Sequence, residues 1–390
     1  MKQPIIPLSV PAFKGNEWRY VKECLDSGWV SSAGKFVEEF EEKLRKKIGA
    51  KYAVACVNGT SGLQLSLRLA GVDRGDEVIA PTLTFIATAN AVRYLGAEPV
   101  FMDCDDHMNI DPDKIENFCR RECAVTKDGL KNRASNRIIK AIMPVHVFGN
   151  PCNLGDLIDV AAKYHLKVIE DATESLGAYY IEGRYKDKFT GTIGDFGVYS
   201  FNGNKIVTCG GGGMIITKDE KQALRARHLS TQAKDDPIRH IHNEVGYNFK
   251  LTSLQAALGI AQLEALECFI KIKKRNYELY KKRLEAVEGA ELLGIPDGTS
   301  PNYWLYSLII DKKRYGMDIE ELMRHLKANG IQARPVWYLN HLQRPYINNR
   351  SYRIEKASWF WRNTLNIPSS SNLTENEIDK VASTIKRLKG

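Results

Sequence analysis

The feature that most constrains the fold is an alternation of short apolar runs with helical segments between about residues 50 and 250. The runs are rich in β-branched residues and read AVACV, VIAP, PVFMDC, IIKAIMPVHVFG and KVIED. Segments of helical period, such as ATANAVRYL, DPDKIENFCRR and NLGDLIDVAAKYH, separate most of them. This alternation predicts an α/β fold with a mainly parallel sheet and helices on both faces. Ligands of such sheets bind at the carboxyl ends of the strands.

The segments before and after this core are more varied. Residues 15–27 and 36–48 carry apolar residues at helical spacing, whereas 124–137 is polar, basic and without a period, which predicts an exposed connection. Thr252 and Gln255 have the spacing of a capping box, and the helix that they open can run past position 280.

The C-terminal third predicts a second, smaller domain. YWLYSLII and IQARPVW read as strands, IEELMRHLKAN reads as a helix that Gly330 ends, and a final helix is expected from about residue 375. We therefore predict a large α/β domain over residues 1–250. A smaller α+β domain over residues 251–390 would begin with a long linking helix.

Composition and charge exclude several classes of protein. The 390 residues are 43% hydrophobic and 26% charged, and no apolar run approaches the roughly 18–20 residues of a membrane span. The eight cysteines are dispersed without a C-x-x-C pair, which predicts no metal site, and the absence of a secretory signal favours a cytoplasmic protein. The net charge of +9 fits nucleic acid or an anionic substrate, but no nucleic-acid-binding motif supports the former.

Two features at the ends of predicted strands could bind a ligand. The turn Asn58–Gly62 lies between a strand and a helix, where exposed N–H groups and the helix dipole favour phosphate, with Thr60 and Ser61 as hydroxyl donors. The same turn could equally be an ordinary helix start. Asp171 closes the strand KVIED, where an acid either caps a helix or meets a buried partner.

Two further features follow the predicted strand DFGVYSF. Lys205, in the turn SFNGNK, is either a solvated surface residue or a Schiff-base nucleophile, which needs desolvation or a nearby cation to expose its free amine. Gly210–Gly213 are four consecutive glycines and indicate a place where only bare backbone fits.

Together the four features fit a pyridoxal phosphate site better than four unrelated turns. Such a site needs a phosphate cup, an acid opposite the pyridine nitrogen, a lysine for the aldehyde and a flat group over the ring. Thr60 and Ser61 with Ser200 would form the cup, next to the acid and the lysine named above. Phe85, in TLTFIATAN, is either the ring-stacking group or a core aromatic.

With these residues in place, the sequence resembles the DegT/StrS-type sugar aminotransferases, a branch of the fold type I pyridoxal phosphate enzymes. The segments that match, in order, are SSAGKFVEEFEE, NGTSGLQLSLRLAGVDRGDEVIAPTLTFIATANAV, PVHVFGN, IEDATESLGA, GDFGVYSFNGNKIVTCGGGG and VGYNFKLTSLQAALGIAQLE. The resemblance implies the fold of that group, with pyridoxal 5'-phosphate as cofactor and pyridoxamine 5'-phosphate as its intermediate form.

The resemblance also implies roles for individual residues. Lys205 would form the Schiff base and move the proton, and Asp171 would pair with the pyridine nitrogen. The remaining cofactor contacts would come from Gly59, Thr60, Ser61, Ser200 and Phe85.

The resemblance implies roles for two further residues, Asn248 and His146. Asn248, in GYNFK, would reach the phosphate in the neighbouring subunit, which implies a homodimer with shared active sites. His146, in PVHVFGN, falls near the site in this family and is either a substrate contact or a packed histidine.

One position departs from the family pattern. Where Glu174 stands, many relatives carry Gln or His, which donates a hydrogen bond to the phenolic oxygen of the cofactor, and an ionised carboxylate cannot donate. Glu174 is therefore either protonated or turned toward substrate or solvent. Together with SFNGNK and STQAK, it resembles the subset that acts on nucleotide-linked 4-keto-6-deoxy sugars with an acetamido group.

The expected reaction moves the amino group of L-glutamate to C4 of such a sugar, with UDP as the expected nucleotide. Arg334 and Trp337, in QARPVW, are further candidate contacts for the nucleotide sugar. Two alternatives stay open. One is a dehydratase of the same fold, in which histidine replaces the Schiff-base lysine, and the other is a catalytically silent member that acts as a regulator.

Overall fold

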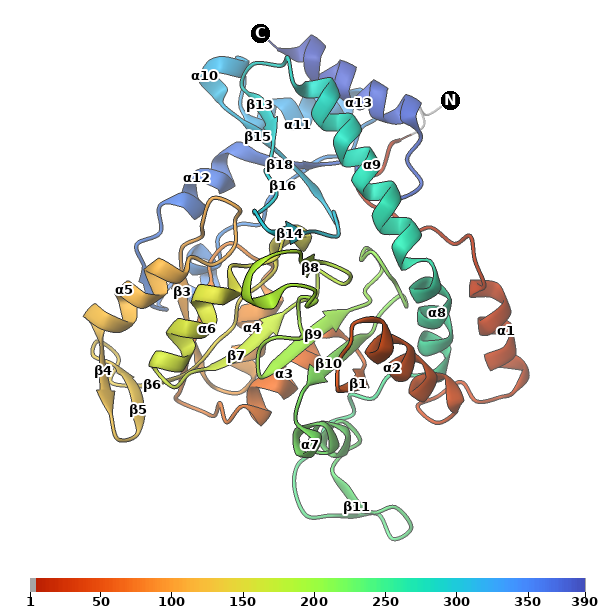
Figure 1. Ribbon diagram of the computed structural model, residues 1–390, viewed down its shortest axis with the longest axis vertical. Coiled ribbons are helices and arrows are strands. Elements are labelled where there is room, and N and C mark those ends of the chain that lie inside the picture. Colours follow the sequence, from red (N-terminus) through yellow and green to blue (C-terminus); the bar gives the residue numbers. More distant parts are fainter. Residues whose placement is uncertain (1–4, 390) are drawn as a thin grey trace.

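The structure is a computed structural model that describes residues 5–389, and its centre is a large mixed sheet (Figure 1). The main path of the sheet has the order β1-β10-β9-β7-β6-β2-β3-β17. Its strands are β1 (Tyr52–Cys56), β2 (Glu77–Pro81), β3 (Glu98–Met102), β6 (Ile138–Ile142), β7 (Lys167–Asp171), β9 (Phe196–Ser200), β10 (Gly213–Thr217) and β17 (Ser351–Tyr352). The strands from β9 to β17 pair in parallel, and β10 pairs antiparallel with both of its neighbours. The prediction of a mainly parallel sheet is confirmed.

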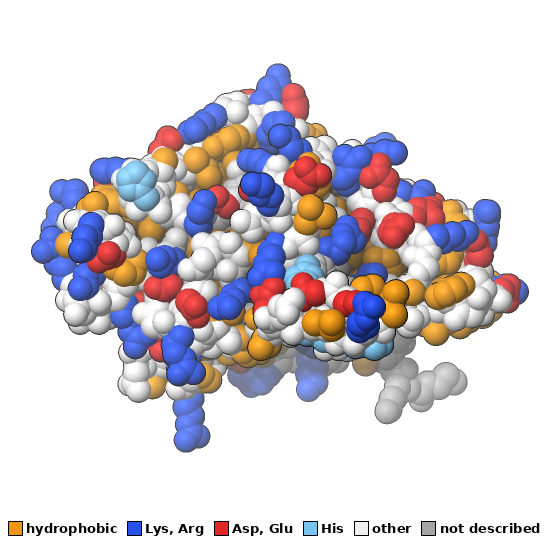
Figure 2. All heavy atoms as spheres, turned by 90° about the horizontal axis from the view of Figure 1, so that it is seen from below, with side chains coloured by type: hydrophobic (Ala, Val, Ile, Leu, Met, Phe, Trp, Pro, Cys, Tyr) orange, Lys and Arg blue, Asp and Glu red, His pale blue; other side chains and the backbone are white. Residues whose placement is uncertain are grey.

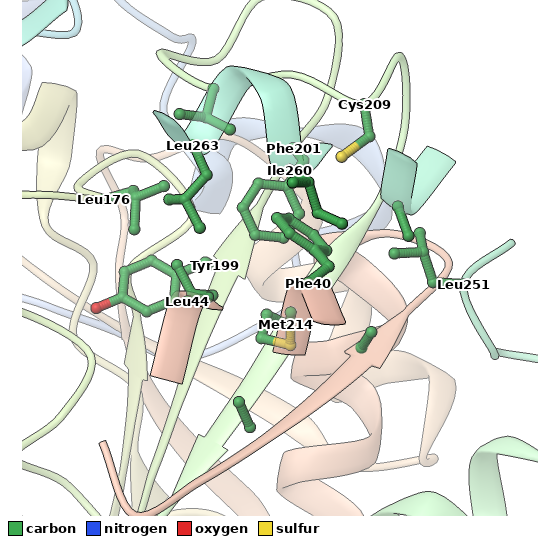
Figure 3. Packing of buried hydrophobic residues seen from close by; sticks show 14 of the residues in the cluster. Phe40, Leu44, Leu176, Tyr199, Phe201, Cys209, Met214, Leu251, Ile260 and Leu263 are labelled. Atoms are coloured by element: carbon green, nitrogen blue, oxygen red, sulfur yellow. The ribbon is translucent and has the colours of Figure 1, made fainter. Parts of the chain in front are cut away.

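Helices cover both faces of the large sheet. They are α1 (Glu17–Asp26), α2 (Lys35–Lys47), α3 (Gly59–Leu69), α4 (Ala87–Tyr94), α5 (Pro112–Glu122), α6 (Leu154–Lys163), α7 (Glu220–Ser230) and α8 (Ser253–Glu264). Because side chains alternate along a strand, Met214 packs into the cluster with α2 and α8, whereas Ile215 packs with α3, α4 and α7. Figure 3 shows the first of these clusters, in which Phe40 meets Phe201 edge to face.

The segment 124–137 differs from its prediction. It contains a hairpin, β4 (Cys123–Thr126) and β5 (Gly129–Asn132), and β5 pairs with β6 of the large sheet. The predicted exposure is confirmed for most of this connection, but the hairpin was not expected. Leu130 and Asn132 point inward, and Asn132 donates a hydrogen bond to buried Glu77, a partner far away in the sequence. A polar local pattern does not reveal such a long-range partner.

The helical segment after Thr252 links the two halves of the chain. The capping box is confirmed, because the Thr252 side chain accepts from the Gln255 N–H and the Gln255 side chain accepts from the Thr252 N–H. The helix is divided at Ala265 into α8 and α9 (Leu266–Leu284). Figure 1 shows α9 rising from the large sheet to the small one.

The C-terminal part forms a small antiparallel sheet of order β13-β15-β18-β16. Its strands and helices are β13 (Ala290–Leu292), β15 (Tyr306–Ile310), β16 (Arg334–Pro335), β18 (Thr364–Ile367), α10 (Lys312–Tyr315), α11 (Ile319–Ala328), α12 (Lys356–Asn363) and α13 (Glu375–Leu388). Gly330 follows α11 with a φ of +74°, as its predicted role as a helix stop requires. The division at residues 250 and 251 stays a prediction, since Ile6 pairs with Ile331 and β17 returns to the large sheet.

Two short ribbons and the surface complete the description. The ribbons are β8 (Tyr179–Tyr180) with β14 (Thr299–Ser300), and β11 (Lys234–Asp236) with β12 (Ile241–His242). Figure 2 shows the face below the large sheet, where Lys and Arg side chains are scattered among Asp, Glu and apolar side chains rather than gathered in one basic surface. Among residues 5–389, no helix is both long and apolar enough to span a membrane.

Candidate active site

A cavity of about 330 Å³ lies where the carboxyl ends of several strands of the large sheet meet the C-terminal part of the chain. Its wall combines residues that follow β1, β2, β7 and β9 with three residues from beyond position 300. The lining residues are Asn58, Gly59, Thr60, Leu63, Thr84, Phe85, Ala87, Thr88, Asp171, Thr173, Glu174, Ser200, Asn202, Asn204, Lys205, Trp304, Arg334 and Trp337. Most of the predicted site residues thus lie in one cavity.

An amine and two carboxylates occupy the deep part of this cavity. The side chain of Lys205 is 12% exposed, and its Nζ lies 3.7 Å from Glu174 Oε1. Asp171, the last residue of β7, is 2% exposed. The sequence left open whether Lys205 is a solvated surface residue, and its burial beside two acids excludes that alternative.

Burial changes the proton affinity of this amine and its partner. Desolvation lowers the pKa of Lys205, and the negative charges of Glu174 and Asp171 oppose that shift. Desolvation also raises the pKa of Glu174 to about 7, against the effect of the Lys205 charge. Near neutral pH, Glu174 can therefore hold or release a proton beside this amine. This is the behaviour expected of residues that exchange protons with a ligand.

Glu174 is held in place from the backbone. Its Oε2 accepts a hydrogen bond of 2.9 Å from the N–H of Phe148, whose ring stacks on Trp337 with centroids 4.4 Å apart. Phe148 has a φ of +56°, an unusual conformation for a bulky residue. Glu174 is directed toward Lys205 and not toward solvent, since its side chain is only 2% exposed.

The other end of the cavity has the form of a phosphate cup. Helix α3 begins at Gly59, so its N-terminal end lies at the cavity, beside the hydroxyl-bearing residues Thr60 and Ser200. A Cβ at Gly59 would lie 2.9 Å from Thr173 Cγ2 and 3.0 Å from Ser200 Cβ, so only bare backbone fits there. A helix N-terminus with hydroxyl donors is the donor set that a phosphate needs. The residues therefore fit pyridoxal phosphate at this end.

Sequence reasoning missed the partner of Asp171. Thr88 in α4 donates a hydrogen bond of 2.7 Å to Asp171 Oδ2, and the N–H of Thr173 donates to Oδ1 at 3.2 Å. Both donors fix the carboxylate in its orientation. Thr88 stands three residues after Phe85 in the segment TLTFIATAN, but nothing local in the sequence marks its hydroxyl as a partner of a residue 83 positions away.

Trp304 is a second residue that the sequence reasoning missed. Its ring centroid lies 3.8 Å from Lys205 Nζ, and its indole N–H donates a hydrogen bond of 2.7 Å to the carbonyl of Asn204. It belongs to the segment YWLYSLII, which the pattern predicts only as a strand. The structure starts that strand at Tyr306, and Trp304 precedes it in a turn where Tyr303 has a φ of +57°.

Phe85, Arg334 and Trp337 line the cavity as predicted. Phe85 is 53% exposed, which excludes a core role, and Arg334 is exposed in β16.

The four glycines Gly210–Gly213 are not among the residues that line the cavity. A Cβ at Gly213 would lie 2.6 Å from the backbone of Asn58, so this glycine lets the turn before α3 pack closely against β10.

Three predicted site residues lie outside the lining of the cavity. Ser61 is buried in α3, and its N–H donates to the side chain of Asn58 at 2.8 Å. Asn248 is exposed and bridges to Thr231, so its predicted contact would require a second subunit. His146 is fully buried.

The buried imidazole of His146 has two hydrogen-bond partners. Its Nδ1 accepts from the N–H of Cys152 at 3.0 Å, which places the ring proton on Nε2, 3.0 Å from Glu170. Glu170 in turn accepts from the N–H groups of Gly191, Ile193 and Gly194. The structure thus corrects the prediction of a substrate contact, because His146 has no exposed surface and serves as a packed histidine.

Other parts of the chain offer less suitable chemistry. A larger hollow of about 720 Å³ lies at the opposite, amino ends of β2 and β3, but its arginines are already paired, Arg93 and Arg137 with Glu98 and Arg350 with Glu122. In the described part of the chain, no group of three or more His, Cys, Asp or Glu side chains is placed to hold a metal ion.

Comparison with known proteins gives the same assignment over nearly the full length. Residues 11–386 match the DegT/DnrJ/EryC1/StrS aminotransferase family. The GDP-perosamine synthase of Caulobacter vibrioides is 36% identical over 389 residues, covering 99% of this chain and 98% of that protein. The GDP-perosamine synthase of Escherichia coli O157:H7 is 34% identical over 383 residues, covering 98% of each. The structure of DesI with its TDP-sugar product is 29% identical, with a TM-score of 0.86, and covers 99% of this chain and 93% of that chain.

Proposed function

Since the chain belongs to the DegT/DnrJ/EryC1/StrS aminotransferase family, we propose that it transfers the amino group of L-glutamate to C4 of a nucleotide-linked 4-keto-6-deoxy sugar. The products would be a nucleotide-linked 4-amino sugar and 2-oxoglutarate. The observation that carries the proposal is that one cavity contains a buried lysine, two carboxylates and a cup for phosphate.

Membership of the family confirms the predicted enzyme class, a pyridoxal phosphate-dependent sugar aminotransferase. The predicted fold is confirmed as well, because the chain superposes on aminotransferases of this family along almost its entire length. The alternative of a dehydratase requires histidine in place of the Schiff-base lysine, and Lys205 stands there. Intact Lys205 and Asp171 favour an active enzyme over a silent regulator.

The cavity residues would hold the cofactor at three places. The first turn of α3, with Thr60 and Ser200, would bind its phosphate, and Asp171 would face the ring nitrogen and keep it protonated. Phe85 would lie on one face of the ring. When bound, pyridoxal phosphate supplies an aldehyde for the amino group and a ring that withdraws electrons.

Lys205 would act as nucleophile and as proton carrier. Burial lowers the pKa of Lys205, which favours the uncharged amine that a nucleophile requires. Its Nζ would accept the proton that leaves the α-carbon of the amino donor and would deliver it to a different carbon, which is the proton movement that amino transfer needs. Glu174 would serve as the neighbouring proton store, because its own pKa of about 7 lets it donate or accept at that pH.

The nucleotide sugar would enter from the side of the cavity that the C-terminal part provides. Arg334 offers an exposed guanidinium for the diphosphate, and Trp337 offers an aromatic face. The UDP-linked acetamido sugar expected from the sequence remains our first candidate. A GDP-linked sugar is the second, and the relatives named GDP-perosamine synthase favour it.

A homodimer is part of the proposal. Asn248 lies on the surface in its own subunit, close in sequence to the β11–β12 ribbon. There it could reach the phosphate cup of a second copy. Mixing Asn248→Ala chains with chains that carry Lys205→Ala would restore one complete site per dimer if each site uses both subunits.

A substrate panel tests the proposed function. UDP-, GDP- and dTDP-linked 4-keto-6-deoxy sugars would each be incubated with glutamate and the holoenzyme, and the products identified by mass and NMR. We expect one nucleotide series to give the 4-amino sugar with one 2-oxoglutarate per turnover. The Lys205→Ala variant should give none. A deoxygenated keto sugar that carries no new amino group, formed with release of ammonia and 2-oxoglutarate, would instead support the dehydratase, because glutamate supplies the two electrons that deoxygenation needs. No product from any series would reject the substrate class.

A further inference from the structure

The amine of Lys205 has a third neighbour that the proposed chemistry does not use. Besides the two acids, the indole of Trp304 lies across it, with the ring centroid 3.8 Å from Nζ. The face of an indole carries negative potential and attracts an ammonium group within about 6 Å of its centroid. Trp304 is only 3% exposed, so water weakens this attraction little.

The backbone of Trp304 is fixed at three points. Its carbonyl accepts a hydrogen bond of 3.0 Å from the ammonium of Lys273 in α9 and one of 3.1 Å from the hydroxyl of Ser369. Its N–H donates to Asn302 Oδ1 at 3.0 Å. The amide of Asn302 then donates to the carbonyls of Glu174 and Leu176, so the turn that carries Trp304 is tied to the segment that carries Glu174.

Lys273 is an unusual anchor. It is 4% exposed, its Nζ donates to the carbonyls of Trp304 and Ser369, and within the described residues no carboxylate pairs with it. Burial lowers its pKa to about 7. Burying a lysine without an acidic partner is costly for the fold, and here the two backbone carbonyls are the groups that offset this cost.

We propose that Trp304, anchored by Lys273, is the platform that holds the amine of Lys205 whenever this amine is not bonded to the cofactor. The platform keeps the freed amine inside the cavity, between Glu174 and the indole, rather than letting it swing away. Trp304 is thus a positioning residue that acts directly on the reactive amine, and Lys273 is a positioning residue that acts through Trp304. The inference rests on the proposed function, because it assumes that Lys205 is the lysine that reacts.

Fluorinated tryptophans test the platform with almost no change in size. Each fluorine weakens the negative potential of the ring face, so the charged form of Lys205 loses stability. The full chain, purified without cofactor, would be produced with tryptophan carrying zero to three fluorines. The pH dependence of Lys205 acetylation by acetic anhydride would then be followed by peptide mass spectrometry. We expect the midpoint of this profile to fall stepwise, by roughly half to one pH unit over the series.

Three other charged side chains face this amine or line its cavity, namely Glu174, Asp171 and Arg334. They are the same in every member of the series, so they cannot cause a dependence of the midpoint on fluorine. The Trp304→Phe variant is the control, because the other tryptophans still carry fluorine there and the midpoint should stay constant. The exposed Lys274 provides an internal reference within each sample. A midpoint for Lys205 that does not depend on fluorine in the natural chain would overturn the proposal.

Lys273→Met tests the anchor. Without the ammonium, the Trp304 carbonyl loses a donor, and the dependence of the Lys205 midpoint on fluorine should fall by at least half. Lys274→Met, on the next and exposed position of α9, should leave it unchanged. An unchanged dependence in Lys273→Met would remove Lys273 from the proposal, and if this variant does not fold, the fluorine series still decides the role of Trp304. If no sugar of the panel gave a product, the labelling results would be unaffected. The proposed substrate and the proposed role of Trp304 can therefore be refuted independently.

Discussion

Replacing Thr88 by Val removes the donor that fixes Asp171 while keeping the shape of the side chain. The hydroxyl of Thr88 lies 2.7 Å from Asp171 Oδ2, and the two residues are 1% and 2% exposed. A hydrogen bond to a charged group contributes about 1.5–3 kcal/mol, and a buried acceptor that loses its donor cannot turn to water instead. We therefore expect the free energy of unfolding of the cofactor-free chain to fall by about 2 kcal/mol.

Urea denaturation in a double-mutant cycle measures this interaction. In an Asp171→Ala background the acceptor is gone, so Thr88→Val should cost little, and the coupling energy should be about 1.5–2.5 kcal/mol. Ser66→Ala in α3 is the control for losing a buried hydroxyl, because Ser66 Oγ has no hydrogen-bond partner among the described residues and its removal should cost almost nothing. A coupling energy near zero would refute the role of Thr88.

Three further predictions concern the same cavity. Gly59→Ala places a Cβ 2.9 Å from Thr173 Cγ2, and this crowding should weaken pyridoxal phosphate binding about tenfold or more in an absorbance titration, whereas full affinity would contradict the cup. For Glu174, the folded pKa of about 7 lies above its ordinary 4.5, so the protonated acid stabilises the fold at low pH. That stability, up to about 3 kcal/mol for 2.5 pH units, should be lost as pH rises from 4.5 to 7. Denaturation curves of Glu174→Gln should lack this loss, and parallel curves for the two proteins would contradict it. Arg334→Ala should raise KM for the nucleotide sugar about tenfold with little change in kcat, and an unchanged KM would exclude this contact.

The sequence correctly predicted those features of the fold that depend on residues close together in the chain. The capping box at Thr252 and Gln255 depends on neighbours three positions apart, and Gly330 ends a helix because its backbone is left-handed. The parallel sheet follows from alternation of strands and helices. The hairpin at 123–132 was not expected, although β4, β5 and β6 follow one another in the sequence, because the segment is polar and lacks the alternation of a strand. Only the hydrogen bond from Asn132 to Glu77 joins it to a residue far away in the sequence.

In the candidate active site, too, residues at strand ends could be predicted and residues brought in from other segments could not. Asp171, Lys205 and the turn at Gly59 each follow a strand, so the sequence could place them at one edge of the sheet. Thr88 and Trp304 reach the site only through the tertiary fold, and nothing in their own segments separates them from ordinary helix and turn residues.

His146 shows the opposite error. It follows β6 next to the site, but both nitrogens of its imidazole are hydrogen-bonded within the protein, one to the N–H of Cys152 and one to the carboxylate of Glu170. The sequence could suggest its proximity and could not reveal its burial, because the partners come from a loop and from a neighbouring strand.

Borohydride reduction of the holoenzyme identifies the lysine that binds pyridoxal phosphate. The reagent converts a lysine–pyridoxal linkage into a stable secondary amine, which peptide mass spectrometry can then place on one residue. We expect a phosphopyridoxyl group on Lys205. The same group on any other lysine, or on none, would contradict this expectation.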